Sequence, residues 1–181
     1  IDKLKEFKPP ININTSSKVI AEFTNKTYRN VEQSKKPLIL LGGGIRLADQ
    51  VENTNLLIQK LKIPVATTWA ANDVVNFDTE LNLGNVGRSG NRSAIYAVQE
   101  SDFILALGTR FTTKVVIDDK KFAPKAKIAC VDIDNGELND GLVNIHHKMN
   151  CDLRDFIVAM IGERKTLEVK GDWLTYVKEL K

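Results

Sequence analysis

Three glycines follow the first strongly apolar run of the chain, and glycine after a strand lets a backbone approach a phosphate closely. They occupy residues 42–44, directly after the run 37–41, and residues 45–62 then show helical periodicity. The dinucleotide pattern G-x-G-x-x-G is incomplete, because Leu47 stands at its third glycine and no acidic residue ends the apolar run 63–67. The segment therefore predicts an anion-binding turn that differs from the usual NAD mode, or a tight turn without a ligand.

A second group of glycines lies further along the chain. Gly84, Gly87 and Gly90 come shortly before a predicted helix over 91–101, and Arg88 stands among them. Flexible backbone beside an arginine and a helix start is able to contact an anion or a cofactor. An exposed loop without any binding function has the same composition, so both interpretations stay open.

Charged residues stand at the ends of two further apolar runs. Arg110 follows the predicted strand 102–107, where a guanidinium can bind a pyrophosphate through two hydrogen bonds or form a surface ion pair instead. Asp132 and Asp134 end the predicted strand 126–133, where alternation places both on the same side. Such carboxylates accept hydrogen bonds from ribose hydroxyls, and a paired-carboxylate hydrolase or metal site is the rival interpretation.

The histidines and cysteines do not combine into a recognisable catalytic or metal site. His146 and His147 point to opposite faces of an extended segment, so a shared metal is disfavoured. Cys130 lies inside a predicted strand and is expected to be a small buried residue. Two cysteines exclude a disulfide framework and a four-cysteine zinc site. Asp152 begins a predicted helix, either as its N-cap or as a ligand contact.

The elements that must position these residues alternate between apolar runs and helical periodicity. Strands that are apolar throughout are typical of a parallel sheet covered on both faces, which predicts a three-layer, doubly wound, Rossmann-like α/β fold of about six mostly parallel strands. Ligands of such folds bind outside the carboxyl ends of the strands. Strands are predicted over 37–41, 63–67, 102–107 and 126–133 with an edge strand at 142–145, helices over 17–33, 45–62, 91–101, 152–162 and 171–181, and a looser stretch over 69–90.

The composition is that of an ordinary globular protein. Hydrophobic residues make up 43% and charged residues 27% of the 181 residues, and no apolar run reaches the roughly 20 residues of a membrane span. Residues 1–36 carry eight basic and four acidic residues, so the net charge of +3 comes from this leader and a nucleic-acid partner is disfavoured. We expect a linker over 1–15, one domain over 16–162, a linker with a short helix over 163–181, and a cytoplasmic protein without signal peptide or membrane partner.

Seven short motifs follow one another along residues 15–162. They read KPLILLGGG from Lys36, IPVATT from Ile63, LGNVG from Leu83, AVQESD from Ala97, LALGTRF from Leu105, FAPKA from Phe122 and VDID from Val131. Each motif is weak by itself, but their order is specific. Together they resemble the central domain of thiamine-diphosphate-dependent enzymes, in particular acetolactate synthase and its relatives.

The resemblance implies that the chain is one of three α/β domains of a larger enzyme and is not catalytic by itself. The first domain of such enzymes activates thiamine diphosphate through a glutamate, and the third holds its diphosphate through Mg²⁺. These two domains are the implied partners, in a protein that can form homo-oligomers. The parent would form or break a carbon–carbon bond of a 2-oxo acid such as pyruvate, as a transferase or a lyase.

The resemblance also implies a cofactor crevice, which holds FAD in some members of the family, ADP in others and nothing in several. In acetolactate synthase the FAD plays no net redox part. No catalytic residue and no metal ligand of this chain is implied. Transferred motif by motif, the FAD or nucleotide contacts fall on Gly42, Gly43, Gly44, Thr67, Thr68, Gly84, Gly87, Gly90, Gly108, Arg110, Asp132, Ile133 and Asp152.

Three departures from the acetolactate synthase pattern leave alternatives open. Residues 87–90 read GRSG in place of the usual GMHG, and residues 110–114 read RFTTK in place of RFDDR. Trp69 replaces a smaller residue, and its bulk can obstruct a flavin. A purely structural domain with an empty crevice and a free-standing nucleotide-binding module are the alternative functions. A sirtuin-like deacylase is excluded, because its zinc site needs four cysteines.

Overall fold

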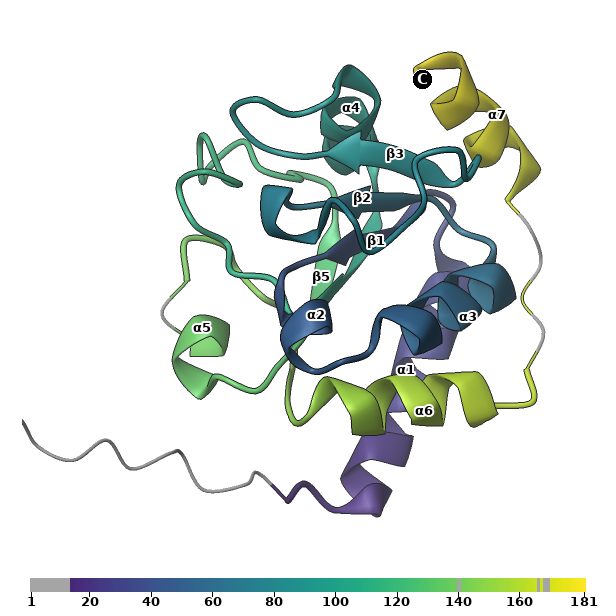
Figure 1. Ribbon diagram of the computed structural model, residues 1–181, viewed down its shortest axis with the longest axis vertical. Helices are drawn as coiled ribbons and strands as arrows, with labels where there is room; N and C mark the ends of the chain where they lie inside the picture. The colour runs from purple at the N-terminus through teal and green to yellow at the C-terminus, as the bar shows by residue number, and fades with distance from the viewer. Residues whose placement is uncertain (1–13, 140, 166, 168–169) are drawn as a thin grey trace, which may run out of the picture.

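The computed structural model describes residues 14–139, 141–165, 167 and 170–181. Six parallel strands form one sheet in the order β3-β2-β1-β4-β5-β6 (Figure 1). The chain turns from one half of the sheet to the other between β1 and β4, and the predicted doubly wound, Rossmann-like fold is confirmed. The strands are β1 Pro37–Leu41, β2 Val65–Thr67, β3 Asn82–Asn85, β4 Phe103–Leu107, β5 Lys127–Asp132 and β6 His147–Asn150.

Helices cover both faces of this sheet (Figure 1). Helices α1, α3 and α6 pack on one face, and α4, α5 and α7 contribute to the core on the other. The helices predicted over 17–33, 91–101, 152–162 and 171–181 are confirmed to within two residues. The helices are α1 Ser17–Gln33, α2 Gly44–Leu47, α3 Val51–Leu61, the 3₁₀ helix η1 Trp69–Ala71, α4 Arg92–Glu100, α5 Asn135–Asn139, α6 Leu153–Gly162 and α7 Gly171–Glu179.

The central strands are buried on both faces, as their unbroken apolar runs predict. All five residues of β1 are buried, with Leu38 and Leu40 in the core on one face and Ile39 and Leu41 in the core on the other. Cys130 of β5 is 1% exposed, which confirms its expected burial. Strands of this kind need a layer of helices on each side, because a face open to water would expose aliphatic side chains.

Segments far apart in sequence meet in the core between the sheet and helices α1, α3 and α6. Tyr28 of α1 donates a hydrogen bond of 2.7 Å from its hydroxyl to the carbonyl oxygen of Met160 in α6, 132 residues later. Burial, with a smaller contribution from Glu163, raises the pKa of Tyr28 to about 12, so the hydroxyl stays a donor over the ordinary pH range. Phe23 and Phe156 meet edge to face with ring centroids 5.7 Å apart. The first helix of the domain is thereby fastened to the last helix of the sandwich.

The helix predicted over 45–62 is wrong in one respect, because the structure divides it into α2 and α3. Asp49 lies between the two helices with a φ of +54°, outside the right-handed helical region. The amide of Gln50, which is 3% exposed, donates to the carbonyl oxygens of Ala48 and Asp49 at 3.0 and 2.9 Å. These side-chain hydrogen bonds replace helical ones at the break, and hydrophobic periodicity does not report them.

Both edges of the sheet also differ from the sequence prediction. Strand β3 lies inside the stretch 69–90 that was expected to be loose, because Asn82 and Gly84 weaken the strand signal. The other edge strand was expected at 142–145, but β6 occupies His147–Asn150 and pairs with Ala129–Asp132 of β5. Pairing with β5 therefore determines this strand, although its sequence is mostly polar and only Met149 is buried.

A half-buried carboxylate, that of Asp102, joins two elements at the amino edge of the sheet, just before β4. Asp102 accepts hydrogen bonds from the hydroxyl of Ser34 and from the backbone N–H groups of Lys35 and Lys36, the latter two at 2.8 and 3.0 Å. Burial would raise the pKa of Asp102, but these hydrogen bonds together outweigh it and lower the pKa. The carboxylate thus joins the end of α1 to the start of β4.

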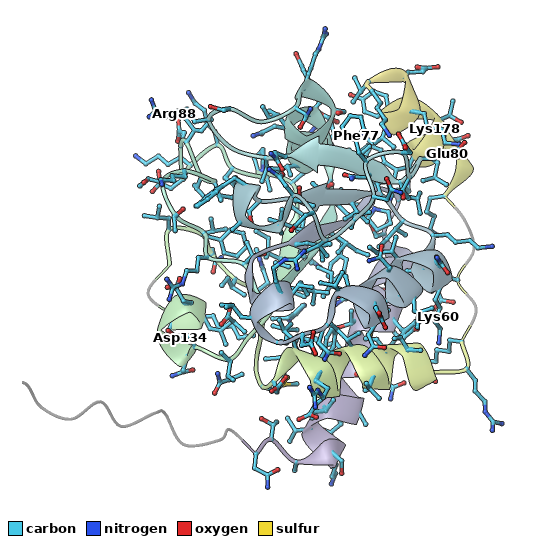
Figure 2. All side chains as sticks on the ribbon, in the orientation of Figure 1. Lys60, Phe77, Glu80, Arg88, Asp134 and Lys178 are labelled. Atoms are coloured by element: carbon cyan, nitrogen blue, oxygen red, sulfur yellow. The ribbon has the colours of Figure 1, made fainter. Side chains whose placement is uncertain are left out.

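The C-terminal helix α7 packs beside this edge. The indole N–H of Trp173, which is 3% exposed, donates to the carbonyl oxygen of Pro37 at 2.9 Å. Lys178 forms an ion pair of 2.6 Å with Glu80, and these two side chains lie together beside α7 (Figure 2). The segment predicted to be a linker with a short helix therefore ends in a helix that packs against the domain. Residues 1–13, most of the predicted N-terminal linker, lie outside the described residues.

Candidate functional site

A cleft of about 530 Å³ opens at the carboxyl edge of the sheet. It lies across the ends of four adjacent strands, β2, β1, β4 and β5, which is where this class of fold binds ligands. Its volume lies within the roughly 300–1,000 Å³ typical of small-molecule sites. The lining residues are Gly43, Gly44, Leu47, Thr68, Trp69, Ala70, Gly108, Arg110, Thr112, Thr113, Lys114, Val115 and Asp132. Six of the thirteen predicted contact residues are among them: Gly43, Gly44, Thr68, Gly108, Arg110 and Asp132.

The floor of the cleft consists of two backbone turns in close contact. The N–H of Gly42 donates to the carbonyl oxygen of Leu107, and the N–H of Gly44 to that of Gly108, at 2.9 and 3.0 Å. A Cβ on Gly42 would lie 2.0 Å from the Gly108 oxygen, and a Cβ on Gly44 would lie 2.7 Å from the Gly108 Cα. These glycines are therefore needed for packing whether or not a ligand binds, while Gly43 and Gly44 still line the space above.

One wall of the cleft carries a buried carboxylate. Asp132, the last residue of β5, is 8% exposed and accepts a hydrogen bond of 2.9 Å from the N–H of Asp134. Burial raises the pKa of Asp132, and that N–H and the charge of Arg110 offset the effect only in part. A carboxylate with this environment has lone pairs available for donors such as ligand hydroxyl groups.

The second carboxylate of the pair predicted at this strand end lies elsewhere. Strand β5 ends at Asp132, so strand alternation does not extend to Asp134, which is exposed beside α5 (Figure 2). Its Oδ1 accepts a hydrogen bond of 2.8 Å from the N–H of Gly136. The expectation that both carboxylates share one side of a strand is therefore wrong, and the two do not form a paired-carboxylate site.

Arg110 lies at the mouth of the cleft. Its side chain is 67% exposed, and its Nε is 3.0 Å from Oε1 of Glu137 in α5. Such an exposed pair contributes about 0–1 kcal/mol, so the guanidinium can exchange this partner for a ligand anion at low cost. The structure thus shows the ion pair that was the alternative interpretation of this residue, in a position that also borders the cleft.

The opposite end of the cleft is formed by an aromatic ring and a lysine. Trp69 begins η1 directly after β2, and its side chain is 61% exposed. Lys114 places its Nζ 5.1 Å from the centroid of the Trp69 ring, a cation–π contact. Both residues are departures from the acetolactate synthase pattern, and neither was among the predicted contacts. A large aromatic side chain exposed beside a cleft indicates a contact residue. The sequence does not report exposure, so it could not identify Trp69 in this way.

The remaining predicted contacts in the glycine-containing loops serve the scaffold in this structure. The hydroxyl of Thr67 donates to Oδ1 of Asn85 at 2.8 Å and thereby joins β2 to β3. Gly84 and Gly87 have φ angles of +85° and +106°, which glycine adopts without strain. A Cβ on Gly90 would lie 2.5 Å from the carbonyl oxygen of Asn85. A ligand contact of these residues stays a prediction.

Arg88, in the same loop, points into solvent (Figure 2). Its backbone N–H donates to the carbonyl oxygen of Lys114 at 3.2 Å, so the loop contacts the segment that borders the cleft. The last two predicted contacts lie beyond the lining. Ile133 is 54% exposed after β5. Asp152 is the N-cap of α6 and accepts from the N–H of Arg154 at 2.8 Å, as its alternative interpretation predicted.

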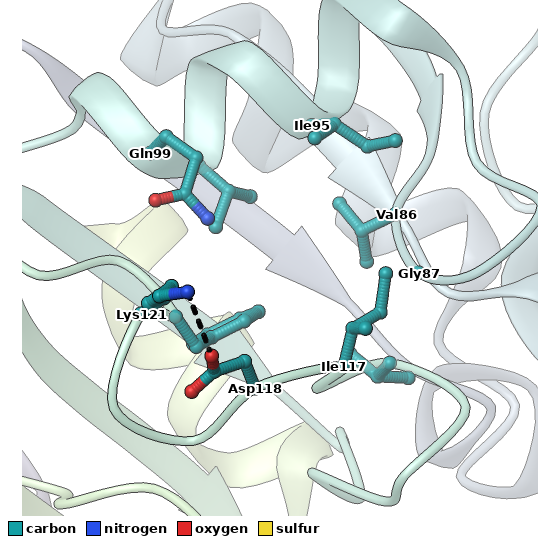
Figure 3. A pocket seen from close by; sticks show the side chains of 10 residues that line it. Val86, Gly87, Ile95, Gln99, Ile117, Asp118 and Lys121 are labelled. Carbon is teal, nitrogen blue, oxygen red and sulfur yellow. Dashed lines mark ion pairs between the residues drawn. The ribbon is translucent and has the colours of Figure 1, made fainter.

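A second pocket, much smaller, lies between α4 and the loop that follows β4. Figure 3 shows Val86, Ile95 and Ile117 along it, with the ion pair of Asp118 and Lys121 at 3.4 Å on another side. It encloses about 90 Å³, well below the size of a nucleotide site. This small pocket is therefore no candidate for a nucleotide site, whereas the cleft at the carboxyl ends of the strands is large enough.

Two further features of the described residues bear on the candidate site. Within the described ranges, no three His, Cys, Asp or Glu side chains come together as a potential metal site. His146 accepts a hydrogen bond of 3.2 Å at its Nδ1 from the N–H of Ile128, so it contributes to strand pairing. No helix in the described part of the chain is long and apolar enough to span a membrane.

Comparisons with known proteins agree with this architecture. Residues 24–160 match the model of the family described as thiamine pyrophosphate enzyme, central domain. The probable acetolactate synthase large subunit of Methanocaldococcus jannaschii is 36% identical over 99% of this chain and 29% of that protein. The acetolactate synthase large subunit of Lactococcus lactis is 31% identical over 96% of this chain and 30% of its own length. That of Corynebacterium glutamicum is 32% identical over 83% and 25%.

The chain spans less than a third of the length of these relatives. The match to the family model runs from α1 to α6 and so includes all six strands and every wall of the cleft. Sequence motifs, strand order and the comparisons thus agree with one another. The chain belongs to the thiamine pyrophosphate enzyme family and corresponds to its central domain.

Proposed function

We propose that this domain holds an adenine nucleotide, FAD or ADP, in the cleft and does not itself perform the thiamine chemistry of the full-length protein. The observation that supports this most strongly is Asp132, a buried carboxylate with a raised pKa that faces the cleft. Burying a carboxylate without a full set of donors costs stability, and a ligand that brings hydroxyl donors would recover part of that cost.

The residues of the cleft fit such a ligand. Asp132 would accept hydrogen bonds from ribose hydroxyls, and Arg110 would contact the phosphates in place of Glu137. Gly43 and Gly108 leave room for a diphosphate to lie close to the backbone. If FAD is the ligand, it would supply a planar ring capable of accepting electrons, and the domain would position that ring.

For the full-length protein we propose an acetolactate synthase-like activity, the formation or cleavage of a carbon–carbon bond of a 2-oxo acid such as pyruvate. The support is that its relatives are named acetolactate synthase large subunits. Thiamine diphosphate and Mg²⁺ would then be held by the domains on either side, which would be the partners of this one, in a homo-oligomer.

A purely structural domain with an empty crevice is the second candidate. Two observations favour it. The N–H groups of Gly42 and Gly44 already have acceptors in the neighbouring turn, and Arg110 already has a carboxylate partner. Under this hypothesis the glycines and Asp132 are retained as scaffold, and the domain contributes by packing alone.

Titration of the purified domain with FAD and with ADP, followed by thermal unfolding and calorimetry, tests the two candidates. A ligand at 100 times its Kd adds about 2.7 kcal/mol to the free energy of unfolding, which is readily measured. We expect Arg110→Ala to weaken binding of ADP and FAD alike by about tenfold and to leave the fold intact. Arg46→Ala is the matched control, because Arg46 forms an exposed ion pair with Asp73 and does not line the cleft. No response to either ligand would favour the structural domain.

A further inference from the structure

Strand β6 forms an open edge of the sheet. It is the last strand in the order, and within the described ranges it pairs with β5 alone. The N–H of His146 donates to the carbonyl oxygen of Ile128 in β5 at 2.9 Å. Because the backbone groups of successive strand residues point to opposite sides, those of His147 and Met149 face away from β5. The edge therefore offers backbone donors and acceptors to a further strand.

A groove runs between this edge and helix α1. It has a volume of about 360 Å³, and its lining includes Val19 and Phe23 of α1 and Met149 of β6. Val19 is 47% exposed, and Phe23 is a partly buried residue that packs against the core. Thr15 bounds the groove at the end of β6, where its hydroxyl donates to the carbonyl oxygen of Asn150 at 2.8 Å. A chain that paired with β6 would thus meet apolar side chains on the side of α1.

The other side of this edge carries a lysine. Because side chains alternate along a strand, Lys148 points to the face opposite Met149, where its Nζ donates to Oδ1 of Asn139 in α5 at 3.0 Å. Lys148 is exposed. A strand added at this edge would therefore place its alternate side chains against two different surfaces. One is the apolar wall of the groove on the side of α1, and the other is the Lys148 ammonium on the side of α5.

Positive charge predominates around the groove. Among the described residues that line it, Lys26 and Lys148 are basic and Glu22 is acidic. Burial and, next, the charge of Lys26 lower the pKa of His147 at the start of β6. A second copy of this chain paired edge to edge would bring like charges together, which is destabilising. A strand that carries acidic side chains complements the edge instead.

We propose that β6 receives an extended segment of a protein partner as a seventh strand, and that this segment alternates apolar with acidic side chains. The apolar side chains lie against Val19 and Phe23, and the acidic ones lie beside Lys148. Backbone pairing supplies the affinity in this mode of recognition, and the two faces of the edge supply the specificity. The groove shares no lining residue with the cleft, so the inference does not depend on the proposed nucleotide.

Hydrogen exchange at the amides of His147 and Met149 tests strand addition in the purified chain. The probe is a short fluorescent peptide that alternates valine with glutamate, and the control is the same peptide with its backbone nitrogens methylated. At ten times its Kd, the unmethylated peptide should slow exchange at both amides by about tenfold, because exchange then proceeds from the unbound fraction. The methylated peptide lacks backbone donors and should leave exchange unchanged.

Two variants test the side-chain pattern by fluorescence anisotropy. Lys148→Gln should weaken the peptide by about threefold, and Val19→Glu, which puts a carboxylate on the apolar wall, by at least as much. Lys165→Gln is the control for the first, because Lys165 is also exposed and donates to an asparagine, Asn25, at 3.2 Å. Val158→Glu is the control for the second, because Val158 is a 53% exposed valine of α6. Neither control residue lines the groove, so both variants should bind as the wild type does.

Four outcomes would overturn the inference. Equal slowing of exchange by the methylated peptide would show contact without strand pairing. A peptide with lysine in place of each glutamate that binds as tightly would remove the acidic specificity. Protection of both amides in the chain alone, together with a dimer in light scattering, would assign the edge to a second copy. If no peptide slows exchange, Lys148 only hinders edge pairing, as lysines on edge strands do.

Discussion

Two carboxylates at opposite edges of the same sheet, the half-buried Asp102 and the buried Asp132, have opposite environments. Asp102, at the amino edge, accepts hydrogen bonds from one hydroxyl and two backbone N–H groups, and its pKa is lowered. Asp132, at the carboxyl edge, lies in the wall of a cleft, and burial raises its pKa. The first side chain is supplied with donors by the protein itself, whereas the second is not fully supplied.

The difference separates a structural use of charge, at Asp102, from the binding role that we propose for Asp132. A carboxylate that accepts hydrogen bonds from donors of neighbouring elements lowers the free energy of the folded state and joins those elements together. A carboxylate that is buried with too few donors raises that free energy, and such residues gather at binding and catalytic sites. The carboxylate at the amino edge has its hydrogen-bond donors within the protein, whereas the one at the carboxyl edge keeps acceptor capacity, which supports the ligand site that we propose there.

The largest effect on stability is expected at the two backbone turns that pack against each other at the carboxyl edge. Gly42→Ala would place a Cβ 2.0 Å from the Gly108 carbonyl oxygen, and the two backbone turns would have to separate. We expect a loss of about 3 kcal/mol in the free energy of unfolding, measured by urea denaturation. Gly162→Ala is the control, because nothing lies within 4 Å of its added Cβ. Equal stability of the two variants would show that the turns are not in close contact.

The next largest effect belongs to the amino edge. Asp102→Ala removes the acceptor of three hydrogen bonds and leaves the N–H groups of Lys35 and Lys36 without it, at a cost of about 2 kcal/mol. Because the folded-state pKa of Asp102 is lowered, its contribution is present above the unfolded-state pKa of about 3.9 and is lost as the pH falls through the lower folded value. Unfolding free energies of wild type and variant should therefore converge in acid. A difference that persists unchanged at pH 2 would contradict this account.

The same substitution at the two carboxylates should have opposite signs. Asp132→Asn removes a charge that burial disfavours, so we expect stability at pH 7 to rise by about 0.5–1 kcal/mol. Because the folded-state pKa is raised, this gain should disappear as the pH falls below the unfolded-state value. Asp102→Asn should lower stability under the same conditions. Denaturation at pH 7 measures both, and a loss of stability in Asp132→Asn would remove the distinction between the two edges.

The smallest effects compare the two lysine–aromatic contacts. Lys36 lies 5.7 Å from the ring centroids of both Trp173 and Tyr176 and also pairs with Glu100 at 2.9 Å. Lys114 has the one contact with Trp69. We expect Lys36→Gln to cost about 1 kcal/mol and Lys114→Gln less than about 0.5 kcal/mol in thermal unfolding. The reverse order would show that the Lys114–Trp69 contact at the carboxyl edge stabilises the fold more than the contacts of Lys36 do.

Much of the fold is predictable from local patterns in the sequence. The helix over 17–33 has an amphipathic stripe and a Ser16 N-cap, and its bounds agree with Ser17–Gln33. The central strands are short apolar runs, and their burial on both faces of the sheet agrees with this local pattern. The break at Asp49 and the position of β6 were not predictable in this way. The first depends on a buried glutamine side chain, and the second on pairing with β5.

The candidate site was predictable in its residue types but not in its arrangement. Glycines, Arg110 and Asp132 at strand ends follow from the general behaviour of parallel sheets. The close contact of Gly42 with Gly108 is invisible in the sequence, because the two lie in separate turns that meet only in the folded chain. The structural role of Asp102 was not predictable either, because its hydrogen-bond donors come from the distant segment at the end of α1.

The hydrogen bond from Tyr28 to Met160 has a consequence for synthesis on the ribosome. Helix α1 packs against a helix whose Met160 is translated 132 residues after Tyr28. A nascent chain therefore exposes the apolar face of α1 until residue 160 has left the exit tunnel, and the first core cannot close before then. A chain truncated within α6 should be a chaperone substrate, whereas the chain that extends past residue 162 has every strand and both partners of this closing contact.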